Sequence, residues 1–105
     1  MTRAARINPK HRQKLILDAA VKLSSMIGYE NITRDAVAEI ADVSSPLVGK
    51  YFGRMSELKN AVIREAIIQE NVQIIAQGII SKNTYTKRIN VKLRHKVIEY
   101  LSKLK

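Results

Sequence analysis

The sequence predicts an all-α protein of five helices, the fourth long and the last short. Apolar residues recur at helical spacing along most of the chain. Asn, Thr and Ser stand where several of these apolar stripes begin, as helix N-caps do. Gly28 follows the first stripe, where a residue without a Cβ ends a helix at low cost. At 105 residues, the chain suits one domain with a modest core that a partner subunit would stabilise.

Composition narrows the classes of function. The chain carries 19 Lys and Arg against 9 Asp and Glu, a formal net charge of +10. This surplus indicates a polyanionic partner, with nucleic acid first and an anionic membrane surface second. The absence of cysteine excludes disulfides and thiolate metal sites and suits a reducing cytoplasm. No apolar run reaches the length of a membrane span, and the N-terminus lacks the apolar segment of a secretion signal.

The sequence offers no catalytic pattern. Two His and scattered acids give no metal-ligand spacing, no nucleophile–base pair and no phosphate-binding glycine loop. We therefore expect no enzymatic activity, no cofactor and no metal.

The first segments combine a basic arm with an amphipathic helix. Residues 1–8 carry basic residues and no acid, and we expect a flexible arm. Its Arg3 and Arg6 could enter a DNA minor groove, or the arm could be a tail that touches phosphates loosely. Asn8 followed by Pro9 predicts the start of a helix over residues 9–27.

Residues 31–52 predict two short helices joined by a tight turn. Thr33 can cap the first helix, and Asp35 lies in its first turn, where the helix dipole favours an anion. Val43 is the apolar residue that such a turn buries, and Ser44 can cap the second helix. This is the helix-turn-helix pattern, whose second helix enters the DNA major groove. Periodicity alone also allows a plain helical hairpin in a small α-bundle.

The C-terminal part predicts a long helix over residues 55–80, a turn over 81–86 and a last helix over 87–104. The long helix is apolar on more than one side, so it should pack on more than its own head. We expect residues 66–105 to form a homodimer by four-helix packing; the alternative is a monomer whose last helix folds back on the fourth. The residues expected at the dimer interface are Ile67, Val72, Ile75, Ile79, Leu93, Val97 and Leu101.

Residues 9–65 resemble the DNA-binding domain of TetR-type bacterial transcriptional regulators. The matching runs are ILDAAVKLSSMIGYENIT, VAEIADVSSPLVGKYF and GRMSEL, which keep the spacing of the family pattern. Three positions depart from it: Met55 replaces a phosphate-contacting Lys, Arg54 replaces a capping Ser, and Gly49 replaces a Tyr of the recognition helix. TetR-type proteins usually continue into a domain that binds a small effector, and we expect this chain to lack that domain and its pocket.

The resemblance and the helical pattern together give the expected DNA contacts. Thr33 and Arg34 would meet phosphate as in the family, and Arg54 would supply the charge missing at Met55. Leu47 could pack on a thymine methyl. The full expected set is Arg3, Arg6, Thr33, Arg34, Ser44, Ser45, Leu47, Lys50, Tyr51 and Arg54.

The basic C-terminal helix suggests a second interaction surface. Lys92, Arg94 and Lys96 could contact DNA again or an acidic protein partner, or could form a solvated polar face. The expected function is a sequence-specific repressor that binds an inverted repeat as a homodimer. The alternatives are a DNA-binding accessory or activator protein of a phage or plasmid, and a protein–protein adaptor.

Overall fold

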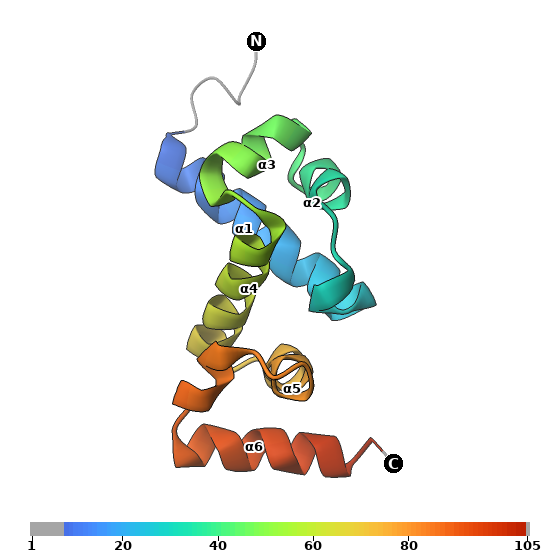
Figure 1. The fold of residues 1–105 in the computed structure, drawn as a ribbon, viewed down its shortest axis with the longest axis vertical. Helices are drawn as coiled ribbons and strands as arrows, with labels where there is room; N and C mark the ends of the chain where they lie inside the picture. Colours follow the sequence, from blue (N-terminus) through green and yellow to red (C-terminus); the bar gives the residue numbers. More distant parts are fainter. Residues whose placement is uncertain (1–7, 105) are drawn as a thin grey trace.

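The computed structural model describes residues 8–104, and this part of the chain is built from helices, as the sequence predicts. The elements are α1 (Pro9–Ile27), the 3-10 turn η2 (Tyr29–Asn31), α2 (Arg34–Ala41), α3 (Ser45–Phe52), α4 (Met55–Gln69), α5 (Val72–Ile80), the 3-10 turn η3 (Thr84–Arg88) and α6 (Val91–Ser102). The molecule extends over 49 Å: α1, α2 and α3 are grouped toward one end, and α4 connects them to α5 and to α6 at the other end (Figure 1). In this described part, none of the helices has both the length and the apolar character that crossing a membrane requires.

The predicted helix caps are confirmed at the first two helices. The Asn8 side chain accepts a hydrogen bond from the backbone N–H of His11 at 2.8 Å. Gly28 ends α1 with φ at +90°, a conformation that L side chains rarely adopt. The Thr33 hydroxyl accepts from the backbone N–H of Ala36 at 3.2 Å. These local bonds satisfy backbone groups that a helix end otherwise leaves unpaired.

One apolar core runs from the head into the C-terminal helices. Ile16 of α1, Val37 of α2 and Val48 of α3 are buried in it, and α4 connects this head to the rest. Ile74 of α5 and Val97 of α6 belong to the same buried cluster. The helix α4 spans the boundary expected at residues 65–66, so the head and the C-terminal helices share one core.

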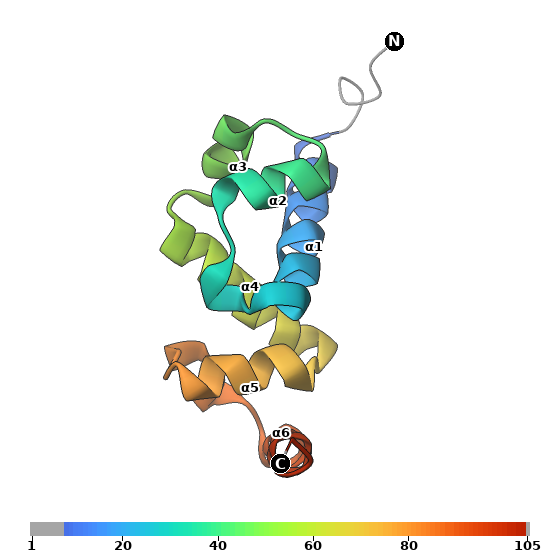
Figure 2. The same cartoon turned by 90° about the vertical axis from the view of Figure 1, so that its right-hand side faces the viewer.

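The prediction of one uninterrupted helix over residues 55–80 was wrong. The chain turns at Glu70, which has a left-handed backbone with φ at 55°, and α5 leaves α4 at a steep angle (Figures 1 and 2). Asn71 starts α5 by accepting a bond from the N–H of Ile74 at 3.2 Å. The bend has a packing reason: it turns α5 onto the head, where Ile74 and Ile75 are fully buried. A straight helix would have left apolar surface on several sides in water.

The last helix is shorter than predicted. Residues 84–88 form η3, and α6 begins only at Val91, because Asn90 caps it by accepting from the N–H of Leu93 at 2.7 Å. Figure 2 shows α6 lying across α5 rather than alongside α4. The helix therefore completes the core through α5.

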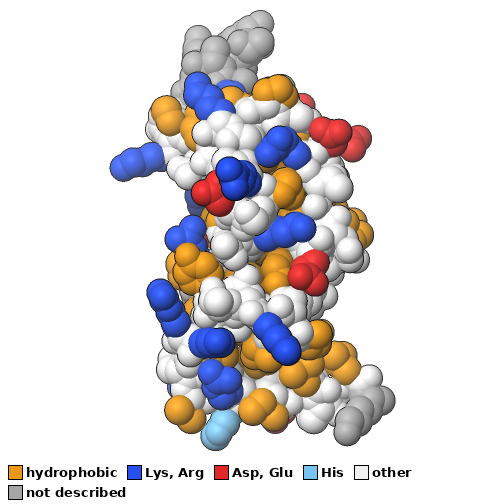
Figure 3. All heavy atoms as spheres, viewed as in Figure 1, with side chains coloured by type: hydrophobic (Ala, Val, Ile, Leu, Met, Phe, Trp, Pro, Cys, Tyr) orange, Lys and Arg blue, Asp and Glu red, His pale blue; other side chains and the backbone are white. Residues whose placement is uncertain are grey.

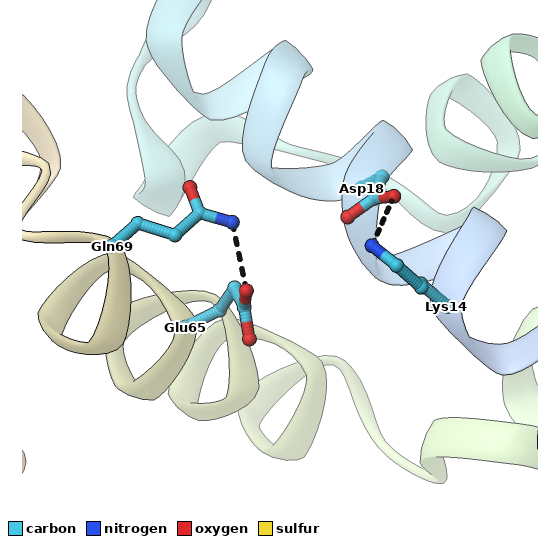
Figure 4. Close-up of polar contacts among 4 residues, drawn as sticks. All are labelled: Lys14, Asp18, Glu65 and Gln69. Atoms are coloured by element: carbon cyan, nitrogen blue, oxygen red, sulfur yellow. Dashed lines mark hydrogen bonds and ion pairs between the residues drawn. The ribbon is translucent and has the colours of Figure 1, made fainter.

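Pairs of side chains four residues apart support the exposed faces of α1 and α4. Lys14 Nζ lies 3.1 Å from Asp18 Oδ2, and Gln69 Nε2 donates to Glu65 Oε2 at 2.7 Å (Figure 4). Such pairs stabilise a helix by about 0.2–0.5 kcal/mol each. Both pairs lie within one helix, so they stabilise α1 and α4 separately and do not join them.

One ion pair fastens α6 to the bend between α4 and α5, and we expect it to make stability depend on pH. Lys96 Nζ donates to Glu70 Oε1 at 2.9 Å, and this contact, with a smaller effect of Lys92, lowers the pKa of Glu70. Because the folded-state pKa is the lower one, the stabilisation is present above the pKa of the unfolded chain and is lost as pH falls through the folded value. Urea unfolding of wild type and Glu70→Gln across pH measures it.

The expected result is a small stability difference at neutral pH that disappears in acid, because both partners are half exposed. Added salt should reduce the difference at neutral pH. A difference that persists unchanged at acid pH would show that substituting Glu70 acts through the bend and not through its charge.

Candidate DNA interface

The helices α2 and α3 meet through a three-residue turn at one end of the molecule (Figure 2). Asp42 begins the turn in the left-handed conformation with φ at 58°, and the N–H of Val43 donates to the carbonyl of Ala38 at 3.0 Å. Val43 packs against the core, as predicted, and Val48 anchors the inner face of α3 with 1% of its surface exposed. The turn and the anchor hold α3 in a fixed position on the head.

The outer face of α3 is left for a partner. Ser44 and Lys50 are exposed, and Ser45 and Leu47 are half exposed. Leu47 is absent from the apolar side chains that pack on the core, unlike its neighbours Tyr51 and Phe52. An apolar side chain between hydroxyl groups and a cation suits the edge of a base pair flanked by phosphates.

The serines at the start of α3 behave differently from the prediction. Ser44 occupies the N-cap position, but its side chain makes no capping bond. Ser45 Oγ instead donates to Asp35 Oδ1 at 2.5 Å, which links the first turns of α3 and α2. The Ser45 hydroxyl is therefore held by Asp35. The hydroxyl of Ser44 is the one left available to a phosphate or base.

Arg34 connects α2 to the turn after α3. Its Nη2 donates to the carbonyl of Gly53 at 3.1 Å, and its guanidinium lies against Gly49. The Nε atom is buried and has no hydrogen-bond partner among the described residues. Arg34 therefore has a structural role in addition to the phosphate contact expected for it, and the remaining guanidinium N–H groups are those that could meet phosphate.

Gly49 lies against the Arg34 guanidinium, and substitution of this glycine by alanine should stabilise the protein. A Cβ at Gly49 would lie 3.5 Å from Arg34 Cζ, which is ordinary contact. We therefore expect Gly49→Ala to raise the free energy of unfolding by about 0.5–1 kcal/mol, the difference in helix propensity. Urea unfolding measures this change.

Gly78 of α5 is the matched control for Gly49. A Cβ at Gly78 would approach Thr86 Cγ2 to 2.8 Å and Ile63 Cδ1 to 2.9 Å. The same gain in helix propensity is then opposed by overpacking of about 1–3 kcal/mol. Gly78→Ala should give no stabilisation, and an equal gain at both glycines would contradict the packing of α5 under η3.

The other expected DNA contacts lie around the same end of the molecule. Thr33 is exposed, and its hydroxyl still has a proton to donate to phosphate while its oxygen caps α2. Tyr51 is half buried against the core, and Arg54 is exposed at the start of α4. Arg3 and Arg6 lie outside the described residues.

The turn between α3 and α4 also supports the recognition helix, although the motifs of the sequence did not predict it. Gly53 has φ at +76°, and its carbonyl receives the bond from Arg34. The Glu57 carboxylate accepts from the backbone N–H of Arg54 at 2.9 Å, so Glu57 caps α4 in place of the missing Ser. A glycine directly after the apolar end of α3, followed four residues later by Glu, is the sequence signal that points to this turn.

The residues expected to pair two copies of the chain fall into two groups. Ile75, Leu93 and Val97 are buried in the chain's own core. Ile67, Val72, Ile79 and Leu101 are half buried and pack against that core. The large apolar side chains of this region that remain exposed are Ile68, Ile80, Val91, Ile98 and Leu104.

The basic residues of α6 differ in whether they form an ion pair within the described part of the chain. Lys96 is paired with Glu70, whereas Lys92 and Arg94 are exposed.

Within residues 8–104, no group of three or more His, Asp or Glu side chains is arranged to hold a metal ion.

The fold and the geometry of α2 and α3 define a helix-turn-helix DNA-binding head. Residues 16–62 match the model of the bacterial regulatory proteins of the tetR family, and this head is therefore a TetR-type DNA-binding domain. The HTH-type transcriptional repressor KstR of Rhodococcus jostii (strain RHA1) is 44% identical over 57 residues. The matched part is 53% of this chain and 27% of KstR, so the chain spans well under half of that relative. No solved structure matches the chain significantly.

Proposed function

We propose that this chain is a sequence-specific DNA-binding transcriptional regulator that represses by occluding a promoter. The observation that carries the proposal is the outer face of α3, where Ser44, Leu47 and Lys50 are turned away from the core of a TetR-type head. A helix held in this way can enter a major groove with its N-terminal end at the bases. The relative that matches the head is named a transcriptional repressor, which favours repression over activation. A regulator of this kind would work in the cytoplasm and need no catalytic group.

We further propose that two copies bind an inverted repeat, one recognition helix to each half-site. Half-sites about 34 Å apart would place both copies of α3 in successive major grooves on one side of the duplex. Support for a pair comes from α6, where Val91 and Ile98 are exposed and lie seven residues apart on one face. Covering this face would remove apolar surface from water. Leu101, which was predicted at the interface and is half buried, would lie at the edge of this α6 contact.

The test of DNA recognition is selection from a random pool of duplexes with the purified chain, with its mass measured in the same buffer. Enrichment of a palindrome bound by a dimer would support the regulator and supply its operator. Salt-sensitive binding without enrichment would favour an architectural or accessory role, as in the replication or recombination of a phage or plasmid. No DNA bound at physiological salt would exclude the DNA-binding function and favour an adaptor.

Substitutions on α3 connect the enriched sequence to the proposed surface. Lys50→Ala should weaken binding to all sequences and reduce the salt slope by about 1, as loss of a phosphate contact does. Leu47→Ala should relax the selected sequence at one base pair of each half-site. Lys103→Ala, at the opposite end of the chain, is the matched control and should change neither quantity.

The pairing surface has its own test. Ile98→Glu should shift the mass of the protein from dimer to monomer in sedimentation equilibrium, because it places a charge in the proposed apolar contact. Met26→Glu, at an exposed apolar position on α1, is the control. A dimer that survives Ile98→Glu would place the contact elsewhere, and a wild-type monomer would exclude it.

A further inference from the structure

A basic pocket lies at the end of the molecule opposite α3. It has a volume of about 330 Å³ and is formed by the C-terminal end of α5, by η3 and by α6. Its lining residues are Ile79, Lys82, Asn83, Thr86, Lys87 and Arg94. Three of them are cations and none is an acid. Figure 3 shows Lys and Arg side chains gathered over η3 and the adjoining part of α6.

The backbone at the end of α5 places Lys82 at this pocket. Lys82 has a left-handed backbone with φ at 63°, a position where Gly or Asn is usual. Its N–H donates to the carbonyl of Ile79 at 3.0 Å, and the N–H of Asn83 donates to that of Gly78 at 2.8 Å. These bonds close the end of α5 and keep Lys82 in this unfavourable backbone conformation. In this conformation the Lys82 side chain lines the pocket.

The neutral lining residues are fixed by bonds within the protein. Asn83 Nδ2 donates to Asn60 Oδ1 at 2.9 Å, and Asn83 Oδ1 accepts from the N–H of Tyr85 at 2.9 Å. Thr86 Oγ1 donates to the carbonyl of Asn83 at 2.6 Å. Most of their polar groups are already used, so recognition of a ligand would fall mainly to the three cations.

Those cations are not neutralised by the residues that the structure describes. Among residues 8–104, no carboxylate forms an ion pair with Lys82, Lys87 or Arg94, whereas Lys96 nearby on α6 is paired with Glu70. Two further cations, Arg64 and Arg88, lie 5.3 Å and 5.5 Å from the ring centre of Tyr85 in η3, and neither of them lines the pocket. The larger groove between α1 and α4 has a different character, because Asp18 and Glu65 line it together with its cations.

We propose that the pocket formed by Lys82, Lys87 and Arg94 binds a phosphate group. Two ammonium groups and one guanidinium offset the negative charge of a phosphate and supply several N–H donors to its oxygens. The phosphate could belong to a small phosphorylated molecule or to a nucleic-acid backbone. The elements η3 and α6, which contribute lining residues, lie toward the end of the molecule opposite α3 (Figure 1), so a straight duplex bound by α3 would not occupy the pocket as well.

The test is a titration of the full chain with inorganic pyrophosphate at low ionic strength, monitored through the chemical shifts of the backbone amides by NMR. The expected result is saturable shifts at the amides of residues 82–87 and of Arg94. The triple variant Lys82→Gln, Lys87→Gln, Arg94→Gln should weaken binding at least about tenfold, because each charge-assisted bond is lost. All three side chains are exposed, so the variant should keep its fold, which the spectrum itself verifies.

The matched control removes the same charge elsewhere, with Lys22→Gln, Lys59→Gln and Lys103→Gln. Equal weakening by the control would overturn the proposal, because binding would then follow net charge alone. Shifts that do not saturate at millimolar pyrophosphate would overturn it as well.

A short duplex without the operator separates the two sources of phosphate. Displacement of pyrophosphate from the pocket by the duplex would identify the nucleic-acid backbone. Shifts confined to the head would exclude the nucleic-acid backbone as the source and leave a small phosphorylated molecule. Both results support the pocket, and neither depends on the operator or on repression, so the proposed function can fail independently.

Discussion

Replacing Gly53 with alanine is expected to lower the free energy of unfolding by about 2–4 kcal/mol, the sum of backbone strain and a lost cap. Gly53 has φ at +76° and ψ at −132°, a region that is nearly restricted to glycine. The added Cβ would clash with Glu57 Oε1, so the Glu57 carboxylate would have to move. Its bond to the N–H of Arg54 would then be lost. Urea unfolding measures the change.

The same substitution should weaken DNA binding, because Gly53 supports the recognition helix. The Gly53 carbonyl accepts the bond that fixes Arg34, and the turn sets the direction of α3 relative to α4. Affinity for an enriched operator should therefore fall at temperatures where the variant is still folded. Retained stability and affinity in Gly53→Ala would contradict this account of the turn.

A double-mutant cycle with Glu57→Ala tests the cause. Glu57→Ala alone should cost about 0.5–2 kcal/mol, the range for loss of a helix cap. In the double variant the clash is absent, so its loss in free energy of unfolding should be smaller than the sum of the losses in the two single variants. Simple additivity would mean that backbone strain at Gly53 acts alone.

Replacing Ile63 with alanine is expected to lower the free energy of unfolding by about 2–5 kcal/mol. Ile63 is fully buried on α4, and its Cδ1 lies close to Gly78 of α5 and belongs to the core shared with the head. Alanine would remove three carbon atoms and leave a cavity, because helices on both sides hold the space open. Urea unfolding followed at the head and at α6 measures it.

Ile68→Ala is the matched control on the same helix. Ile68 is 75% exposed, so its truncation should change stability by no more than about 0.5 kcal/mol. Because one core joins the head to α5 and α6, the signals from both regions should shift together in Ile63→Ala. Separate transitions, or similar effects at Ile63 and Ile68, would contradict a single cooperative unit.

Most of the local structure was determined by the sequence. The caps at Asn8 and Thr33 and the end of α1 at Gly28 were predicted because each depends on neighbours three or four residues away. The buried stripe of α1 and the helix-turn-helix followed from spacing in the same way. The family of the head could also be inferred, since its pattern lies within one continuous stretch that the matched model confirms.

Only the tertiary structure decided where the remaining apolar residues lie. The helix breaks at Glu70 because turning α5 onto the head buries Ile74 and Ile75, a gain that periodicity along the chain cannot measure. The same packing buries Leu93 and Val97, which periodicity had indicated as residues for a partner. The orientation of Arg34 also depends on tertiary structure, because its guanidinium donates to the carbonyl of Gly53, nineteen positions away. The pocket of Lys82, Lys87 and Arg94 likewise exists only once α6 lies across α5, because its residues are brought together by contacts distant in sequence.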